Sequence, residues 1–271
     1  MGMTQPDDAL TITHIGGPTV VLDLAGFRIV SDPTFDPPGA YPIGKRQLVK
    51  LTAPAVGVGT LGRIDLALLS HDQHPDNLDV AGRSLLGSVP AVLSTPTAAS
   101  RMEDVTGLEP WQSAGFALPD GRELRVTALP ARHGPVGCEP LTGPVTGFAL
   151  DCEGLPRTYV SGDNAAVELV EQIVDRMGTF DVVILHAGAA RTPLLDSAAL
   201  TLTTADAVSV ARVLGTAAIV PVHTEGWSHF SEDAGALAAA FAEAGMAYRL
   251  HVPTAGVPLR FSGDQSVRSG G

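Results

Sequence analysis

The sequence is poor in the residues and the runs that several large classes of protein require. It has two cysteines, Cys138 and Cys152, too few for a Cys-type zinc site or a disulfide framework, and we interpret both as reduced thiols. No stretch approaches the roughly 20 continuous apolar residues of a membrane helix. Residues 1–8 are polar and lack the basic start and the apolar run of a signal peptide. We therefore expect a cytoplasmic protein without a membrane span.

Basic residues are also scarce. The chain has 17 Lys and Arg against 29 Asp and Glu, which gives a net charge of −12. A surface of that sign repels polyanions, so we expect no nucleic-acid partner. A small anionic substrate remains compatible, because bound metal cations reverse the field locally. With so few thiols, His, Asp and Glu are the side chains left to bind a metal.

The order of the expected elements bears on the fold class. The chain has no internal repeat, no low-complexity tract and no linker, so we predict one domain over residues 1–271 with a core at about 10–255. Short strands come first as hairpins and later alternate with helices, which favours helix-covered sheets packed face to face. Residues 36–62 are rich in Pro and Gly, and we expect a long irregular loop that covers a site.

Periodicity and turn residues give the individual elements. Thr203 or Thr204 is expected to cap one helix and Ser231 the next. The expected helices are 165–177, 204–214 and 233–244. The expected strands are 10–14, 19–24, 27–30, 64–69, 91–94, 123–129, 146–151, 158–161, 182–185, 218–222 and 247–252.

Side chains that can bind a metal follow several of these strands. Strand ends gather at one edge of a sheet, so such residues can converge although they lie far apart in the sequence. Imidazoles and carboxylates that converge at one point would bind a divalent ion such as Zn²⁺, Mn²⁺ or Fe²⁺. Taken singly, each has a structural alternative: a hydrogen-bonded histidine, a turn aspartate, or a polar loop that caps a helix. The candidates are His71, His74, Asp76, His133, Asp163 and His223.

Six ordered segments together resemble the metallo-β-lactamase superfamily, most closely its ascorbate-6-phosphate lactonase-like and phospholipase-D-like metal hydrolases. The resemblance covers about residues 10–255. It implies a four-layer α/β/β/α sandwich with the metal at one edge of two sheets. The segments that carry it are the hairpin at 12–22, the strand ending in Asp32-Pro33, the signature at 70–79, and the later motifs 130–133, 161–163 and 221–223.

The signature departs from the family pattern. The family has His-x-His-x-Asp-His, whereas this chain reads His71-x-x-His74-x-Asp76-Asn77. Without a gap, Gln73 would take the position of the second histidine. One inserted residue instead aligns His74 and Asp76 with family ligands and leaves Asn77 in place of a histidine, and an amide is a poorer ligand for zinc than imidazole. The opening hairpin also has Gly17 where this branch often has His, so the site holds either one metal or two.

The resemblance implies a role for each ligand. His71, His74 and His133 would hold one metal, Asp76 and His223 a second, and Asp163 would bridge them. A metal-bound hydroxide would then attack a small ester, lactone or phosphoester. Asp76 and Asp163 would be the catalytic carboxylates, with Asp76 orienting the water or accepting its proton.

Six further residues are expected near the site. We predict that His186, Trp227 and His229 contact the substrate, and that Asp72, Asn77 and Asp79 support the ligands. Packing or solvent exposure explains each of them equally well. A second hypothesis for the whole chain is a metal-poor family member that binds a ligand or a partner without turnover. The oligomeric state stays open, a homo-oligomer included.

Overall fold

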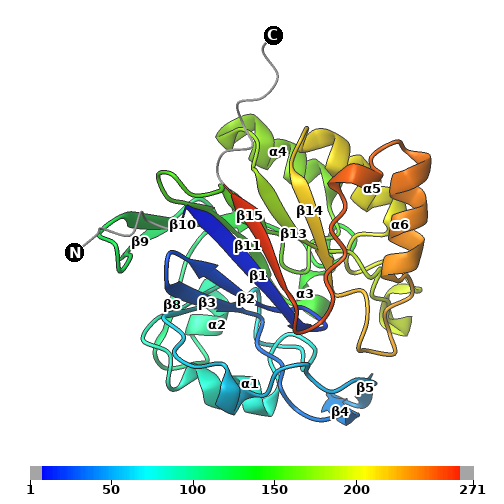
Figure 1. Cartoon of the computed structure of the whole chain (residues 1–271). Helices are drawn as coiled ribbons and strands as arrows, with labels where there is room; N and C mark the ends of the chain where they lie inside the picture. Colours follow the sequence, from blue (N-terminus) through cyan, green and yellow to red (C-terminus); the bar gives the residue numbers. More distant parts are fainter. Residues whose placement is uncertain (1–7, 263–271) are drawn as a thin grey trace.

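Two β-sheets packed face to face form the centre of the computed structural model, which describes residues 8–262 (Figure 1). One has seven strands in the order β15-β1-β2-β3-β6-β7-β8: β1 (Ala9–Gly16), β2 (Thr19–Leu24), β3 (Phe27–Ser31), β6 (Leu66–Leu68), β7 (Val92–Ser94), β8 (Val105–Gly107) and β15 (Pro258–Ser262). The other has six in the order β14-β13-β12-β11-β10-β9: β9 (Ser113–Ala117), β10 (Glu123–Pro130), β11 (Thr146–Asp151), β12 (Thr158–Val160), β13 (Val182–His186) and β14 (Ala218–Val222).

Helices cover the outer faces of both sheets, which completes the predicted α/β/β/α sandwich. On the seven-stranded sheet lie α1 (Val80–Leu86) and the short α2 (Pro96–Ala99). The six-stranded sheet is covered by α4 (Val167–Met177), α5 (Thr204–Val213) and α6 (Ala234–Glu243). Short turns of helix complete the set: α3 (Glu139–Thr142), η1 (Val58–Thr60), η2 (Pro193–Leu195) and η3 (Ala247–Arg249). No helix within the described residues is long and apolar enough to cross a membrane.

The alternation of strand side chains explains why both faces of each sheet are buried. In β13, Val182 and Ile184 pack between the two sheets, whereas Val183 and Leu185 pack under the helices. In β2, Leu22 faces the other sheet and Val21 faces α1. Strands covered on both sides read as continuous apolar runs, because side chains of period two then meet apolar partners on either face.

The strand directions bring several carboxyl ends to one edge. β12, β13 and β14 are parallel, and β10 runs the same way because both β10 and β12 are antiparallel to β11. From the other sheet, the end of β6 joins this edge through a hydrogen bond of 3.1 Å from the Thr146 N–H to the Ser70 carbonyl. The residues that follow these strands therefore meet at one end of the sandwich.

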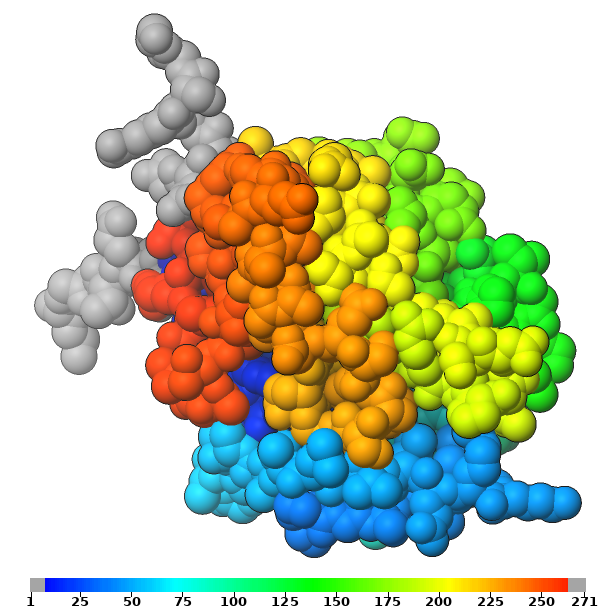
Figure 2. Space-filling model, turned by 90° about the vertical axis from the view of Figure 1, so that its right-hand side faces the viewer, coloured from blue at the N-terminus to red at the C-terminus, as the bar shows by residue number. Residues whose placement is uncertain are grey.

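The region 36–62 is more ordered than expected. It contains a hairpin of β4 (Gly39–Ile43) and β5 (Arg46–Lys50). The hairpin is held by the loop after β14, since the Leu51 N–H donates to the Gly226 carbonyl and the Ser228 N–H donates to the Val49 carbonyl. This segment lies across one end of the molecule, against the segments that follow β13 and β14 (Figure 2). The prediction of a purely irregular loop was wrong, because β4 and β5 pair with each other in register across the turn at 44–45.

Two smaller predictions were also wrong. The strand expected at 247–252 is a 3₁₀ turn followed by extended chain, and the last strand is β15, which pairs with β1. Asp233, not Ser231, caps α6 by accepting the Ala236 N–H. Of the two predicted caps, Thr203 and Thr204, it is Thr203 that caps α5, in a capping box with Asp206. Residues 1–7 of the polar amino-terminal segment lie outside the described part of the chain.

Candidate metal centre

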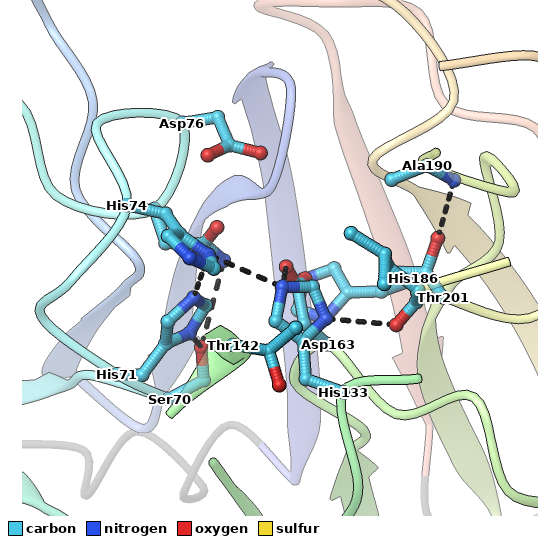
Figure 3. A network of polar contacts seen from close by, with 12 residues as sticks. Ser70, His71, His74, Asp76, His133, Thr142, Asp163, His186, Ala190 and Thr201 are labelled. Carbon is cyan, nitrogen blue, oxygen red and sulfur yellow. Dashed lines mark hydrogen bonds and ion pairs between the residues drawn. The ribbon is translucent and has the colours of Figure 1, made fainter. Parts of the chain in front are cut away.

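Three imidazoles converge where β6 and β10 end. The Nδ1 atom of His74 lies 2.9 Å from Nε2 of His71 and 3.1 Å from Nε2 of His133 (Figure 3). Atoms bound to one zinc ion at about 2.0–2.2 Å are at most about 4.4 Å apart, so these three nitrogens are close enough to share an ion.

Hydrogen bonds and burial keep two of these rings neutral, the form in which an imidazole binds a metal. The Nδ1–H of His133 donates to the Leu200 carbonyl at 2.8 Å, which leaves the Nε2 lone pair facing the other rings. Nδ1 of His71 lies 3.0 Å from the Ser70 hydroxyl. Burial lowers the pKa of His133 to about 3 and the pKa of His71 well below its usual range. Both rings are therefore neutral at pH 7, as metal binding requires.

A second triad, of Asp76, Asp163 and His223, lies beside the first. Nε2 of His223 is 3.3 Å from Asp76 Oδ2 and 3.5 Å from Asp163 Oδ1. The other oxygen of Asp163, Oδ2, is 3.6 Å from Nε2 of His133 in the first triad. One carboxylate thus faces both triads, which is the position of a bridging ligand.

The unpaired atoms of the second triad test whether these residues suit a metal. Both oxygens of Asp163, Oδ1 of Asp76 and both ring nitrogens of His223 are buried without a hydrogen-bond partner among residues 8–262. Buried polar atoms without partners are costly, and few remain in a folded protein. Burial and the neighbouring Asp76 and Asp32 carboxylates raise the pKa of Asp163 well above its usual range. A divalent cation would pair these atoms and compensate the charge, so the donor set fits one.

The backbone around His223 brings its imidazole into the site. His223 has a φ of +58°, in the left-handed region that costs energy for a side chain with a Cβ. The segment after β13 packs directly on this residue: a Cβ on Gly188 would lie 1.9 Å from the His223 carbonyl oxygen. Only glycine at 188 allows the two strand ends to approach so closely.

The loop after β6 resolves the two alignments of the signature. His74 joins the histidine triad, whereas Gln73 points toward Gly143, where an added Cβ would lie 2.1 Å from the Gln73 amide nitrogen. The Asn77 amide lies 3.5 Å from the Ser70 hydroxyl. Burial raises the pKa of Asp32 and of Asp163, and the Asn77 amide opposes that rise. The inserted-residue alignment is the one that agrees with this geometry.

Asp72 and Asp79 contact structural partners. Asp72 accepts from the Arg101 Nε–H at 2.9 Å. Asp79 caps α1 by accepting the Gly82 N–H and pairs with the Lys50 ammonium at 3.3 Å. Since α1 begins at Val80, the helix cap at this position is Asp79 and not Asn77.

The three residues predicted to contact substrate have different locations. His186 is fully buried behind Asp163, with Nδ1 3.8 Å from Asp163 Oδ1 and Nε2 3.9 Å from Asp32 Oδ2. Trp227 is buried beneath the hairpin and fills the space at Gly17, where an added Cβ would lie 3.2 Å from its indole nitrogen. His229 alone of the three lines a pocket, and its Nε2 lies 3.0 Å from Asp76 Oδ2.

This pocket lies over the two triads, because residues of both triads line it. His74, Asp76 and His133 form its polar floor, and Arg46 and Arg191 are its cationic residues. The rest of the wall is mostly aliphatic, and comes from the hairpin, from α3 and from the segment after β13: Ile43, Leu48, Leu141, Leu194, Leu195 and Leu200.

Sequence reasoning did not assign a site role to Asp32 or Arg46. The Asp32 carboxylate accepts the Ser70 N–H at 2.7 Å, and burial raises its pKa to about 7. The signal for Asp32 is the Ser-Asp-Pro sequence at the end of β3, which also belongs to the segments of the family resemblance. Arg46 gave no signal, because its hairpin was expected to be irregular and its Nη1–H bonds Thr192, distant in sequence.

Comparison with known proteins agrees with this geometry. A model of the beta-lactamase superfamily domain matches residues 27–224, so the chain belongs to that superfamily. Comparison with curated proteins gave no match.

Solved structures of the same fold cover almost the whole chain. An isothiocyanate hydrolase from Delia radicum gut bacteria is 22% identical, with a TM-score of 0.77 over 93% of this chain and 99% of that one. A possible metal-dependent hydrolase from Veillonella parvula is 19% identical, with a TM-score of 0.77 over 92% and 98%. CmlA, a diiron β-hydroxylase from Streptomyces venezuelae, is 16% identical, with a TM-score of 0.66 over 96% and 55%. These likenesses establish the metallo-β-lactamase fold, and their different activities leave the reaction to be argued from the site.

Proposed function

We propose that this protein is a metal-dependent hydrolase of the ascorbate-6-phosphate lactonase-like branch, acting on a small ester, lactone or phosphoester. The observation that carries the proposal is the contact of one carboxylate, Asp163, with both groups of ligands: one of its oxygens faces His133 and the other faces His223. Residues of both groups line the floor of an open pocket. His71, His74 and His133 would hold one ion of zinc, manganese or iron. Asp76 and His223 would hold a second, with Asp163 between them.

The residues around the ions have separate tasks. A bound ion would lower the pKa of a water from 15.7 to about 7 and so supply a nucleophile at neutral pH. Asp76 lines the pocket and has one oxygen, Oδ1, without a hydrogen-bond partner in the described chain, which suits it to orient that water or accept its proton. Asp163 lies beneath, where its two oxygens fix the spacing of the triads.

The pocket wall favours a substrate with an apolar part and one anionic or strongly polar group. Leu48, Leu195 and Leu200 offer aliphatic surface close to the triads. Arg46 also lines the pocket. Burial is the main cause that lowers the pKa of His74, and the charge of Arg46 acts in the same direction. Guanidinium groups recognise carboxylate and phosphate oxygens by paired hydrogen bonds, so Arg46 is the residue for such a group.

Metal content and turnover together test the proposal. Protein purified without chelator should contain one or two divalent ions per chain by elemental analysis. It should hydrolyse at least one member of a panel of p-nitrophenyl esters, γ- and δ-lactones and bis-p-nitrophenyl phosphate. An aryl isothiocyanate belongs in the panel because one protein of similar fold is named for that substrate. Chelation should abolish the activity, and added metal should restore it.

Asp163→Asn is the decisive variant. It removes the charge between the triads without changing the size of the side chain, so we expect at least a 100-fold loss of kcat. His251→Gln is the matched control, because His251 packs on Phe261 and lies beside the start of β14, at the opposite end of that strand from His223. A chain that holds no metal as purified would instead support a ligand-binding protein without turnover. Full activity in Asp163→Asn would contradict the assignment of the site.

A further inference from the structure

The second ligand triad has a histidine beside it that the family signature does not account for. We propose that His229 is a ligand of the second metal ion and supplies the imidazole that the chain lacks at Asn77. The second site would then consist of Asp76, Asp163, His223 and His229. The inference rests on the proposed two-metal site and concerns its composition, not the reaction.

Two imidazoles point at the same carboxylate oxygen. Asp76 Oδ2 is 3.0 Å from Nε2 of His229 and 3.3 Å from Nε2 of His223. The two rings stand nearly perpendicular, with centroids 6.5 Å apart at 82°, so they approach Asp76 from different directions. The remaining nitrogen of His229, Nδ1, is buried and has no hydrogen-bond partner within residues 8–262. Both Nε2 atoms thus lie within about 4.4 Å of Asp76 Oδ2, the distance that two ligands of one ion can span.

Backbone contacts on both sides fix the position of His229. The Arg191 N–H donates to the His229 carbonyl at 3.1 Å, and the Ser228 N–H donates to the Val49 carbonyl at 3.0 Å. Phe230 packs against both imidazoles, with its ring centroid 3.9 Å from that of His223 and 4.6 Å from that of His229. A histidine held this way loses little further freedom when it binds a metal.

The two positions where the family has other histidines cannot supply this ligand. Asn77 lies by the Ser70 hydroxyl and carries no basic nitrogen. Gly17 has a φ of +56° and its side-chain space is filled by Trp227. Trp227 and His229 belong to the same loop. This loop fills the space of the family histidine at Gly17 with the Trp227 ring, and it also brings the His229 imidazole to Asp76 from the pocket side.

The test is metal binding by the whole chain, first stripped of metal by a chelator. Cobalt(II) is titrated by calorimetry into the wild type, His229→Ala, His229→Gln and the control His251→Gln. We expect two steps in the wild type, and a second step weakened at least about 10-fold in both His229 variants. The first step should stay within about 2-fold, and the control should match the wild type. Gln keeps a hydrogen bond to Asp76 but offers no imidazole.

Proton NMR of the cobalt-loaded proteins identifies the ligand directly. Each imidazole bound to cobalt(II) through one nitrogen gives a strongly shifted, exchangeable resonance from its other N–H. His229→Gln should show one such resonance fewer than the wild type. An unchanged number of resonances, a second step restored in His229→Gln, or a single binding step in the wild type would each overturn the inference. None of these results depends on finding a substrate, so the hydrolase proposal stands or fails separately.

Discussion

At the scale of single residues, the site depends on one close backbone approach. His223 and Gly188 follow the neighbouring parallel strands β14 and β13, and the Ala187 N–H donates to the Val222 carbonyl. His223 takes a left-handed φ while its carbonyl touches Gly188. The position of one proposed metal ligand is therefore set by the absence of a side chain at another residue.

Gly188→Ala should displace His223. Its Cβ would meet backbone atoms that cannot rotate away, so we expect about 1–3 kcal/mol lower stability and at least about 10-fold weaker binding of the second metal ion. Urea unfolding and calorimetric metal titration measure the two effects. Gly57→Ala is the control, because Gly57 has an ordinary φ of −76° and open space around its Cβ position. Equal metal affinities in Gly188→Ala and the wild type would show that His223 tolerates the displacement.

At the scale of elements, the β4–β5 hairpin connects the pocket to the rest of the fold. It provides Ile43, Arg46 and Leu48 to the pocket wall. Its last residue, Lys50, is buried, pairs with Asp79 at the start of α1 and lies 5.6 Å from the Trp227 ring. Burial lowers the pKa of this ammonium, while the Asp79 carboxylate acts in the opposite direction.

Lys50→Met should destabilise the chain by about 3–5 kcal/mol, because it leaves the buried Asp79 carboxylate without its cation. Lys45→Met, in the exposed turn of the same hairpin, should change stability by less than about 0.5 kcal/mol. Urea unfolding at pH 7 compares the two variants. If Lys50→Met and Lys45→Met both changed the free energy of unfolding only slightly, the N–H groups that donate hydrogen bonds to Asp79 would be enough to compensate its charge without Lys50.

At the scale of the whole molecule, the buried site couples stability to pH. In the metal-free protein, burial lowers the pKa of His133 and of His186 to about 3. Between about pH 3 and 6.5 the unfolded histidines bind protons that the folded ones do not, so their contribution to stability falls as the pH falls. Asp32 has the opposite sign. Its folded pKa of about 7 means that between about pH 4 and 7 it is protonated only in the folded chain, and its contribution falls as the pH rises.

Asp32→Asn should therefore make the metal-free protein more sensitive to acid. Removing the opposing group should steepen the loss of stability between pH 4.5 and 6 by up to about 1.4 kcal/mol per pH unit, the value for one proton. Urea unfolding at several pH values in the presence of chelator gives this slope for wild type and variant. Identical slopes would mean that Asp32 is ionised in the folded protein.

The sequence by itself determined the class of fold and the set of candidate ligands. Strand runs, helix periodicity and the Thr203 cap are local signals, read from residues that are neighbours in the chain. The ligands were found in the same way, since each follows a strand and parallel strands end together. His71, Asp163 and His223 needed no knowledge of the pairing beyond that rule.

Only the tertiary structure decided which side chains meet. Strand β15 exists through its pairing with β1, far along the chain, and periodicity carries no information about such a partner. The position of the hairpin at 39–50 against the loop after β14 is set by equally distant contacts. The contact of His229 with Asp76 spans 153 positions, and the placement of His186 behind Asp163 follows from the packing of β13 beside β12. A sequence pattern states which face of a strand is apolar, whereas the distance between two loops depends on every layer packed between them.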